Sequence, residues 1–420
     1  MNKEIVVIGG GASGLAASIA AKQEGRDVLL IEKEDKLGGI LNQCIHNGFG
    51  LEVFKEEYTG PEYAEKYIQK FYKLNIDCLL DTTVMNVDKT EEGFEIILSS
   101  KETGLKKITC KSIVMSTGCY ERTRGSISIP GDRPYGVITA GSAQRYLNID
   151  GYMVGKKVFI LGSGDIGLIM ARRMHLEGAE VLGVAELMPY SNGLTRNIVQ
   201  CLNDFDIPLY LSHTVTEIRS NKNNRLESIV IQEVDGSYKP ISGTEKNFDV
   251  DTLLLSIGLI PDIALLDNLD VEKDNKTKSV KVNQAYETNV PGLFICGNSL
   301  QVHDLVDNVS KESERAGKCA SDYILSKKTN GNDVIKITAG NNLLFVTPHY
   351  ISFSWTSRQT VIQFRSTSKI EKGLLTVTQG DTELLKKRLN FVVPAEMETF
   401  NLDIDTIQKE NDILVNLEVL

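Results

Sequence analysis

Residues 3–32 read KEIVVIGGGASGLAASIAAKQEGRDVLLIE, and this stretch decides the fold class. An apolar run, a glycine-rich turn, an alanine-rich segment up to Gly25 and a second apolar run predict a strand, a helix and a second strand. Strands that are apolar on both faces are typical of a doubly wound parallel sheet covered by helices. The stretch therefore predicts an α/β chain with a Rossmann-like, three-layer module.

The turn has the spacing Gly-x-Gly-x-x-Gly, formed by Gly9, Gly11 and Gly14. The first glycine permits a tight turn, the second lets the backbone approach a pyrophosphate, and the third lets the helix pack on the strand. The helix N-terminus offers N–H groups to phosphates, and Glu32 at the end of the second strand suits a ribose hydroxyl. These features together predict a dinucleotide-binding module.

Residues 156–186, KKVFILGSGDIGLIMARRMHLEGAEVLGVAE, repeat the same order and glycine spacing. Glu186 ends the second strand of this copy, where a carboxylate favours the free 2′-hydroxyl of NAD(H) and repels the 2′-phosphate of NADP(H). Asp165 lies inside the turn, where a carboxylate beside a pyrophosphate is unfavourable unless it points away. The chain is therefore predicted to contain two nucleotide-binding modules.

The segments between and after the modules predict strands. Residues 84–115 indicate three strands joined by tight turns, an antiparallel meander set into the first module. SKKTNGND, from Ser326, is typical of a linker. Alternating apolar and polar residues then predict a small β domain at 335–420, which carries the only tryptophan, Trp355. The apolar face around Phe353 and Trp355 suits either an interface or packing on the domain's own core.

Composition excludes several classes of function. The net charge of −10 argues against a nucleic-acid or anionic membrane partner. Seven scattered cysteines, with no CxxC and no metal-ligand spacing, indicate a reducing compartment and predict no metal site. The apolar N-terminus is better explained by the strand and helix than by a signal peptide. A cytoplasmic enzyme without a membrane span is expected.

Three further segments resemble motifs of two-dinucleotide-domain flavoproteins, the pyridine nucleotide-disulfide oxidoreductase-like family. IVMSTG at 113–118 resembles the family's ATG turn against FAD, and TNVPGLFICGN at 288–298 resembles its second FAD motif. Asn298 replaces the acid that bonds the ribitol in that family. SIGLIPD at 256–262 resembles the crossover out of the NAD domain. The resemblance covers about residues 1–325 and implies FAD on the first module and NAD(H) on the second.

Some segments resemble narrower groups. PYGVITAGSAQ, from Pro134, resembles the FAD subunits of hydrogen cyanide synthase, opine oxidase and dye-linked proline dehydrogenase. Residues 38–50 and 297–317 resemble a flavoprotein that accompanies an anaerobic-type glycerol-3-phosphate dehydrogenase. These resemblances imply an NADH-linked FAD subunit with a partner dehydrogenase subunit or a small redox protein, in a homo- or hetero-oligomer. Residues 320–420 contain no cysteine, so no iron–sulfur cluster is expected in this chain.

The expected domains are an FAD-binding domain at 1–125 and 259–328, an NAD(H)-binding domain at 126–258, and the β domain at 335–420 for an interface or a partner. The expected FAD contacts are Gly9, Gly11, Ala12, Ser13, Gly14, Glu32, Lys33, Gly39, Ile40, Val84, Thr117, Gly118, Gly297, Asn298 and Val309. The expected NAD contacts are Gly162, Gly164, Asp165, Ile166, Gly167, Glu186 and Gly258.

Disulfide reduction is disfavoured because only one cysteine, Cys44, follows the glycine pair at 38–39. The resemblance places Cys44 and His46 beside the flavin ring, which makes them the candidate catalytic residues. A thiolate there would be redox-active, whereas the alternative is a small buried side chain beside a hydrogen-bonded histidine. His303 and Asp304 suit either contact with the flavin or a partner, or orientation of their own turn.

Two smaller expectations concern helices. The helix beginning near Val306 is expected to point its N-terminus at the N1–C2=O edge of the flavin, where it favours the anionic reduced form. Arg196, Asn197 and Cys201 are explained by a surface helix.

The leading hypothesis for function is hydride transfer between NADH and FAD, followed by electron exchange with a partner or a small acceptor. Three alternatives stay open: a substrate-oxidising subunit of an amine, opine or glycerol-3-phosphate-type dehydrogenase, a stand-alone NADH oxidase or peroxidase, and a flavin-binding assembly subunit without its own activity.

Overall fold

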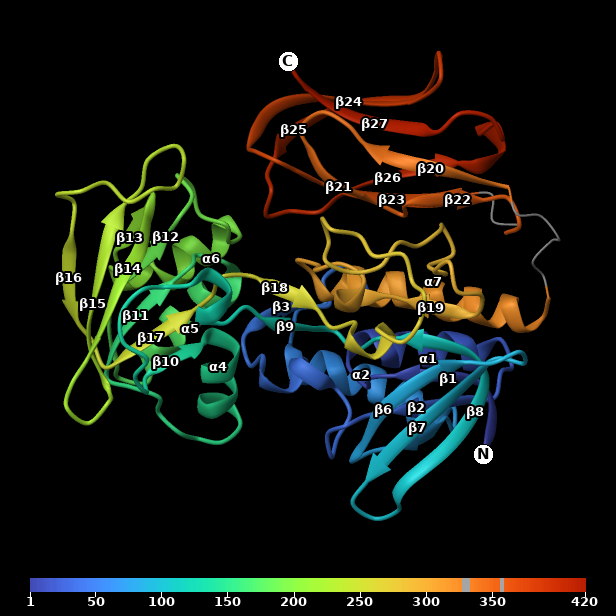
Figure 1. The fold of residues 1–420 in the computed structure, drawn as a ribbon, viewed down its shortest axis with the longest axis horizontal. Coiled ribbons are helices and arrows are strands. Elements are labelled where there is room, and N and C mark those ends of the chain that lie inside the picture. Colours follow the sequence, from blue (N-terminus) through green and yellow to red (C-terminus); the bar gives the residue numbers. More distant parts are fainter. Residues whose placement is uncertain (327–332, 356–358) are drawn as a thin grey trace. The chain divides into compact units, whose positions relative to one another are not determined.

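The computed structural model describes residues 1–326, 333–355 and 359–420 (Figure 1). The chain forms two compact units: unit 1 contains residues 1–42, 47–119 and 261–420, and unit 2 contains residues 43–46 and 120–260. The region expected as a third domain, 335–420, falls within unit 1. Most of the expected linker at 326–333 lies outside the described residues.

A seven-stranded sheet organises the first part of unit 1, in the order β5-β2-β1-β8-β7-β6 with β19 also paired to β8. The strands are β1 (Asn2–Ile8), β2 (Val28–Ile31), β5 (Asp77–Leu79), β6 (Thr82–Lys89), β7 (Phe94–Ser100), β8 (Gly104–Met115) and β19 (Leu293–Ile295). β1, β2, β5, β19 and the second half of β8 are parallel. The first half of β8 pairs antiparallel with β7, and β7 with β6. The predicted parallel sheet with an antiparallel meander is confirmed.

Two helices that are far apart in the sequence pack on each other beside this sheet. They are α1 (Ala12–Gln23) and α7 (Val306–Ile324), and α7 begins where the sequence predicted. Small residues permit the close approach, because a Cβ on Gly317 would lie only 2.2 Å from Ala17 O. The other elements here are η1 (Gly39–Gln43), β3 (Asn47–Phe49), β4 (Tyr58–Thr59), α2 (Gly60–Lys73), η3 (Ala264–Leu266) and η4 (Gly297–Ser299).

Unit 2 contains the second module. Its parallel sheet has the order β10-β17-β11-β12-β13, and a three-stranded antiparallel sheet has the order β14-β15-β16. The strands are β10 (Val137–Thr139), β11 (Lys157–Leu161), β12 (Glu180–Glu186), β13 (Leu209–Leu211), β14 (His213–Ser220), β15 (Leu226–Glu233), β16 (Lys246–Asp249) and β17 (Thr252–Leu255). The helices are α3 (Arg124–Ile127), α4 (Ala140–Asn148), α5 (Asp165–Leu176), α6 (Thr195–Cys201) and η2 (Asn203–Phe205).

The chain passes between the units at 42/43 and 46/47, on either side of residues 43–46, and again at 119/120 and 260/261. The segments at the last two passages, β9 (Cys119–Glu121) and β18 (Leu259–Pro261), pair with each other in a short sheet. The segment resembling the family's crossover, 256–262, therefore includes one of these passages.

The C-terminal region of unit 1 consists of strands, as the alternating sequence predicted, and these strands pack as two sheets. One sheet has the order β22-β20-β27-β24-β25 and the other β21-β23-β26. Apolar side chains from both sheets, including Phe364, Leu375 and Leu417, form one core between them. The elements are β20 (Val334–Ala339), β21 (Leu343–Thr347), β22 (Tyr350–Ser352), β23 (Gln359–Ser366), β24 (Ile370–Gln379), β25 (Thr382–Val392), β26 (Glu398–Asp403), η5 (Ile404–Thr406) and β27 (Ile413–Val419).

Trp355 packs inside unit 1 and is not part of an exposed face. It is buried in the core of the first part of the unit and meets the Phe294 ring edge-on at 6.0 Å between centroids. Its indole Nε1 donates a hydrogen bond of 3.1 Å to Glu287 Oε2. Phe353 packs against the core between the two C-terminal sheets. Of the two uses expected for this face, the structure shows internal packing.

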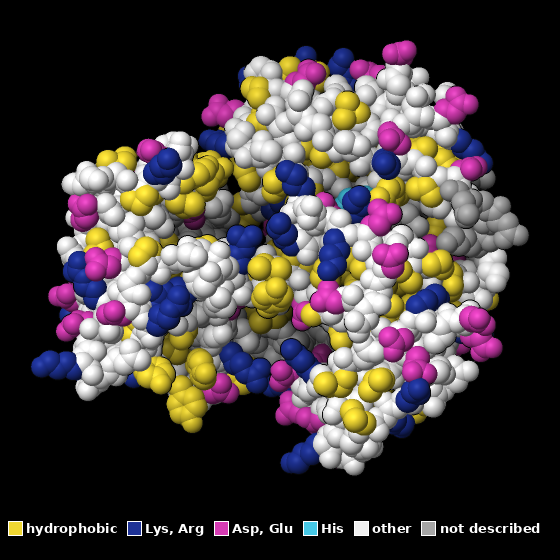
Figure 2. All heavy atoms as spheres, viewed as in Figure 1, with side chains coloured by type: hydrophobic (Ala, Val, Ile, Leu, Met, Phe, Trp, Pro, Cys, Tyr) yellow, Lys and Arg dark blue, Asp and Glu magenta, His cyan; other side chains and the backbone are white. Residues whose placement is uncertain are grey.

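Acidic and basic side chains are interspersed on the face shown in Figure 2. Within the described ranges, no helix combines the length and the apolar character needed to cross a bilayer.

Candidate dinucleotide-binding sites

In the first fingerprint, two glycines are required by the protein's own backbone and one is not. A Cβ on Gly9, whose φ is +105°, would lie 2.4 Å from Ser116 O, and a Cβ on Gly14 would lie 1.8 Å from Gly9 O. By contrast, the nearest atom to a Cβ on Gly11 is Gly39 Cα, 3.9 Å away. Packing within the protein therefore explains Gly9 and Gly14, whereas the space at Gly11 fits the backbone approach of a pyrophosphate.

The N-terminus of α1 is open to an anion. Gly11 is the N-cap residue, and among the described residues no side chain forms a capping hydrogen bond at this end of the helix. The first turn also contains no acidic side chain. The first helical hydrogen bond runs from Leu15 N to Gly11 O, so the N–H groups of Ala12, Ser13 and Gly14 precede it. The Ser13 hydroxyl lies 2.8 Å from Ser313 Oγ in α7. Backbone N–H groups, rather than this hydroxyl, are thus the natural phosphate donors.

Glu32 is buried and its carboxylate is fixed by backbone donors. Gly10 N donates to Oε2 at 2.5 Å and Glu34 N donates to Oε1 at 2.9 Å. Each oxygen keeps a lone pair for a further donor, such as a ribose hydroxyl. Lys33, the next residue, is exposed.

The Gly38-Gly39 turn lies beside the fingerprint. Gly38 N donates to Gly10 O at 2.9 Å, and a Cβ on Gly39 would lie 3.0 Å from Gly11 Cα. Ile40 is exposed next to this turn, whereas Val84 is buried in the core of the seven-stranded sheet.

The two FAD-motif segments meet near the end of β8, where β19 pairs with β8, and the crossover segment joins them there. Thr117 Oγ1 donates to Asp262 O at 2.6 Å, and Asp262 N donates to Gly118 O at 2.9 Å. A Cβ on Gly297 would lie 2.6 Å from Ser13 Oγ, so this glycine lies directly beside α1. Val309 is buried in the first turn of α7.

Asn298 links these segments. Its Oδ1 accepts a 3.0 Å hydrogen bond from His303 N, and its Nδ2 donates to Cys119 Sγ at 3.7 Å. Nearby, Glu312 of α7 is buried and accepts a hydrogen bond of 2.7 Å from Gly297 N. Sequence reasoning missed both Cys119 and Glu312. The only sequence feature that points to Cys119 is its position directly after the ATG-like turn at 113–118.

The second fingerprint repeats the arrangement of the first. A Cβ on Gly162, whose φ is +100°, would lie 2.0 Å from Ser256 O, and a Cβ on Gly167 would lie 2.6 Å from Gly162 O. A Cβ on Gly164 meets nothing closer than Ser256 Oγ at 3.6 Å. The middle glycine again faces space that a bound pyrophosphate fits.

The carboxylate of Glu186 is held as that of Glu32 is. Ser163 donates to Oε2 from its N at 2.9 Å and from its Oγ at 2.7 Å, and Met188 N donates to Oε1 at 2.9 Å. Leu187 follows it and carries no charge. The acid of the second module is therefore fixed at the end of β12 before any nucleotide binds.

Asp165 points away from the turn. Its Oδ1 accepts hydrogen bonds from Leu194 N at 2.8 Å and Asn197 Nδ2 at 2.7 Å, both at the start of α6. The expected conflict with a pyrophosphate is thereby relieved. Helix α6 is a surface helix with one buried face: Arg196 is exposed, whereas Asn197 and Cys201 are buried.

Two further residues expected to contact NAD, Ile166 and Gly258, also lie in unit 2. Ile166 is partly buried in the first turn of α5 and packs against the core of the parallel sheet. Gly258 has a φ of +101° in the turn between β17 and β18, and its O accepts from Arg122 N at 3.0 Å.

Cys44 and His46 belong to unit 2. Cys44 is 8% exposed, and its Sγ lies 3.8 Å from Gln144 Oε1 of α4. Burial raises the pKa of Cys44 to about 12. Burial, together with the charges of Arg196 and Arg172, lowers the pKa of His46. These surroundings are those of the small buried thiol, not of a reactive thiolate.

We expect Cys44 to resist alkylation in the native protein. With a thiol pKa of about 12, only about one thiol in ten thousand is ionised at pH 8, against roughly a quarter for a free cysteine. Site-resolved mass spectrometry after iodoacetamide treatment should find Cys44 labelled slowly when native and fully when denatured in guanidinium. Rapid native labelling would show that the thiol is accessible and ionised.

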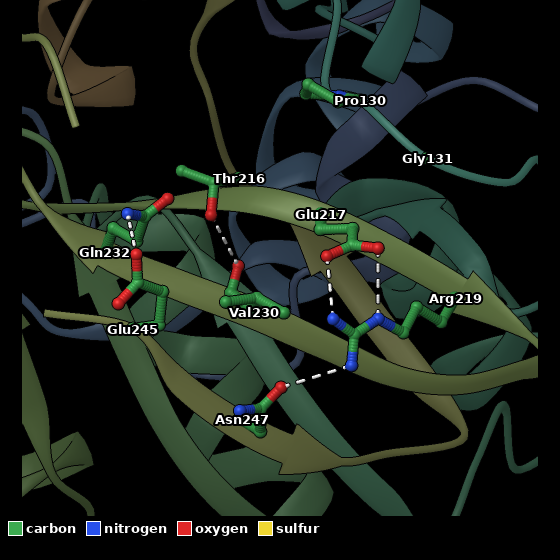
Figure 3. Close-up of a pocket in the computed structure, with 9 residues that line it drawn as sticks. All are labelled: Pro130, Gly131, Thr216, Glu217, Arg219, Val230, Gln232, Glu245 and Asn247. Carbon is green, nitrogen blue, oxygen red and sulfur yellow. Dashed lines mark hydrogen bonds and ion pairs between the residues drawn. The ribbon is translucent and has the colours of Figure 1, made fainter. Parts of the chain in front are cut away.

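A hollow of about 530 Å³ lies elsewhere in unit 2, on the antiparallel sheet (Figure 3). Its wall includes Glu217 and Arg219, which form an ion pair at 2.8 Å, and Gln232, which donates to Glu245 Oε1 at 2.8 Å. These groups satisfy one another on β14, on β15 and just before β16, whereas the fingerprint lies at the ends of β11 and β12. The hollow is therefore separate from the nucleotide site.

The residues at both fingerprints fit dinucleotides. Each module combines an open middle glycine, a helix N-terminus and a fixed, buried carboxylate. The family model for pyridine nucleotide-disulphide oxidoreductases matches residues 3–313. The chain belongs to this family. It is a flavoprotein oxidoreductase with Rossmann-type FAD and NAD(P) domains.

Similar proteins support this assignment. The hydrogen cyanide synthase subunit HcnB of Pseudomonas protegens is 21% identical to this chain. The matched region covers 71% of this chain and 66% of HcnB. Ferredoxin–NADP reductase 2 of Listeria innocua is 23% identical over 70% of this chain and 84% of its own length. Thioredoxin reductase of Lactococcus lactis has the same fold, with a TM-score of 0.63, 18% identity, and coverage of 77% of this chain and 99% of its own. The predicted family and the resemblance to hydrogen cyanide synthase are confirmed.

Proposed function

We propose that this chain transfers a hydride between NADH and FAD and exchanges the electrons with a partner dehydrogenase subunit or a small acceptor. One observation carries the proposal, and it occurs in both fingerprints. The protein's own packing requires glycine at the first and third positions but not at the middle position, Gly11 or Gly164, where a bound pyrophosphate would require it. A chain that used a single nucleotide would need this arrangement only once.

In this proposal, FAD binds the first module and NADH the second. Bound FAD supplies a ring that accepts a hydride from nicotinamide. The N–H groups at the start of α1 and α5 bind the pyrophosphates, and Glu32 and Glu186 accept ribose hydroxyls. The N-terminus of α7 stabilises negative charge on the reduced ring.

The preference for NADH rests on Glu186. Its buried carboxylate would lie close to a 2′-phosphate, and the repulsion between two anions is strong where little water intervenes. The residues after it, Leu187 and Met188, offer no compensating positive charge. We therefore expect NADH to bind more tightly than NADPH.

The test is an anaerobic titration of the purified protein with NADH, and separately with NADPH, following the visible flavin absorbance. NADH should bleach the band at concentrations at least about tenfold lower than NADPH, a difference of about 1.4 kcal/mol. Equal bleaching would contradict the role of Glu186, and a band unchanged by either would contradict hydride transfer.

A second candidate is a substrate-oxidising FAD subunit, favoured by the similarity to a hydrogen cyanide synthase subunit. In that case the flavin would be reduced by an organic substrate of a partner and not by NADH. The same titration separates the two functions.

A further inference from the structure

The segment between Gly297 and α7 has no regular structure of its own after η4. Residues 300–305 form neither helix nor strand, yet several of their polar side chains are buried. Gln301 is 1% exposed and the His303 side chain is fully buried. An irregular segment of this kind needs partners from other elements to keep one conformation.

Two partners come from strand β23 of the C-terminal region. Arg365 forms an ion pair with Asp304, and its Nη2 also donates to Val302 O at 3.0 Å. Gln363 accepts a hydrogen bond from Gln301. Met397 N, from the same C-terminal region, adds a 2.6 Å hydrogen bond to Asp304 Oδ2.

These contacts continue to the FAD motif. Gln301 Nε2 also donates to Glu312 Oε2 at 3.0 Å, and Glu312 Oε1 accepts from Gly297 N at 2.7 Å. His303 Nε2 lies 3.2 Å from the same carboxylate. A continuous set of polar contacts thus joins β23 to the glycine beside α1 and to the first turns of α7.

We infer that Arg365 and Gln363 are positioning residues for the flavin, which makes the C-terminal region part of the FAD site. The inference rests on the proposed FAD site of the first module. Arg365 and Gln363 hold residues 301–304, and this segment fixes the N-terminus of α7. If the segment loosens, FAD loses affinity and the reduced, anionic ring loses the favourable helix terminus.

The geometry supports a strong effect for Arg365. Its side chain is 11% exposed and that of Asp304 is 15% exposed, so the ion pair is largely desolvated. Removing one member of such a pair leaves a buried charge without compensation. The guanidinium also donates to Pro394 O at 2.9 Å and contacts Ala395 O, so it ties both β23 and residues 394–395 to residues 302–304.

The experiment measures FAD affinity by reconstitution of apoprotein, and the midpoint potential of bound flavin by equilibration with a reference dye. We expect Arg365→Ala to raise the Kd for FAD at least tenfold and to shift the potential to more negative values. Arg365→Lys should recover part of both changes. Gln363→Ala removes no charge, should shift both quantities in the same direction by less, and provides the test if Arg365→Ala does not fold.

Tyr350→Phe is the matched control. Tyr350 also ties the C-terminal region to the rest of unit 1, because its hydroxyl donates to Glu272 at 2.5 Å and accepts from Lys281 at 3.3 Å, and neither partner belongs to residues 300–305. This variant should keep the wild-type Kd and potential. Unchanged values in both Arg365→Ala and Gln363→Ala, or equal changes in Tyr350→Phe, would overturn the inference. Wild-type protein that binds no FAD would instead contradict the proposed function.

Discussion

Replacing Gly11 by alanine is expected to give a folded protein that has lost its FAD. The backbone at Gly11 has φ −76° and ψ −168°, which alanine adopts without strain, and a Cβ there lies 3.9 Å from its nearest neighbour. The added methyl instead occupies the space that the pyrophosphate needs. We expect FAD to bind at least about a hundredfold more weakly, a loss of about 2.7 kcal/mol. The FAD content of purified protein and reconstitution of apoprotein measure the change.

Gly14→Ala is the matched comparison, because it adds the same methyl three residues later. There the Cβ would lie 1.8 Å from Gly9 O, so the turn and α1 must separate. We expect this variant to unfold at lower denaturant concentration or to be insoluble. If Gly11→Ala retains full FAD with wild-type affinity, the first fingerprint does not contact the pyrophosphate.

Replacing Gly164 by alanine is expected to leave FAD bound while NADH no longer reduces it at wild-type concentrations. Gly164 has φ −64° and ψ 161°, and a Cβ there lies 3.6 Å from Ser256 Oγ, so the second module should fold normally. We expect the NADH concentration for half-bleaching to rise at least about tenfold, about 1.4 kcal/mol. The anaerobic titration measures it.

Dithionite reduction provides the control for Gly164→Ala, because a chemical reductant does not need the second module. The variant should bleach with dithionite as the wild-type protein does. Bleaching of Gly164→Ala by wild-type concentrations of NADH would place the nicotinamide nucleotide somewhere other than the second fingerprint.

The sequence predicted the parts of the fold that are encoded locally. In each module, the glycine spacing, the continuous apolar strands and the acid, Glu32 or Glu186, lie within about thirty residues of one another, so a single pass along the chain finds them. The same holds for the three-stranded meander and the start of α7. Similar local rules predicted β structure after residue 335.

The rest depended on contacts between residues far apart in sequence, for which one sequence carries no signal. Nothing around Arg365 indicates that its partner is Asp304, and nothing around Trp355 indicates Glu287. Which face of α6 is buried depends on Asn197 meeting Asp165. The environment of Cys44 likewise follows from packing against Gln144, which is one hundred positions away.

The contact between α1 and α7 bears on the order in which the protein folds during synthesis. Gly317 lies against Ala17 O, so the first module cannot complete its packing until some three hundred further residues have left the ribosome. Apart from residues 43–46, unit 2 is continuous in sequence and is released well before α7. The nascent chain should therefore finish its second module first, while α1 and the seven-stranded sheet wait for β19 and α7.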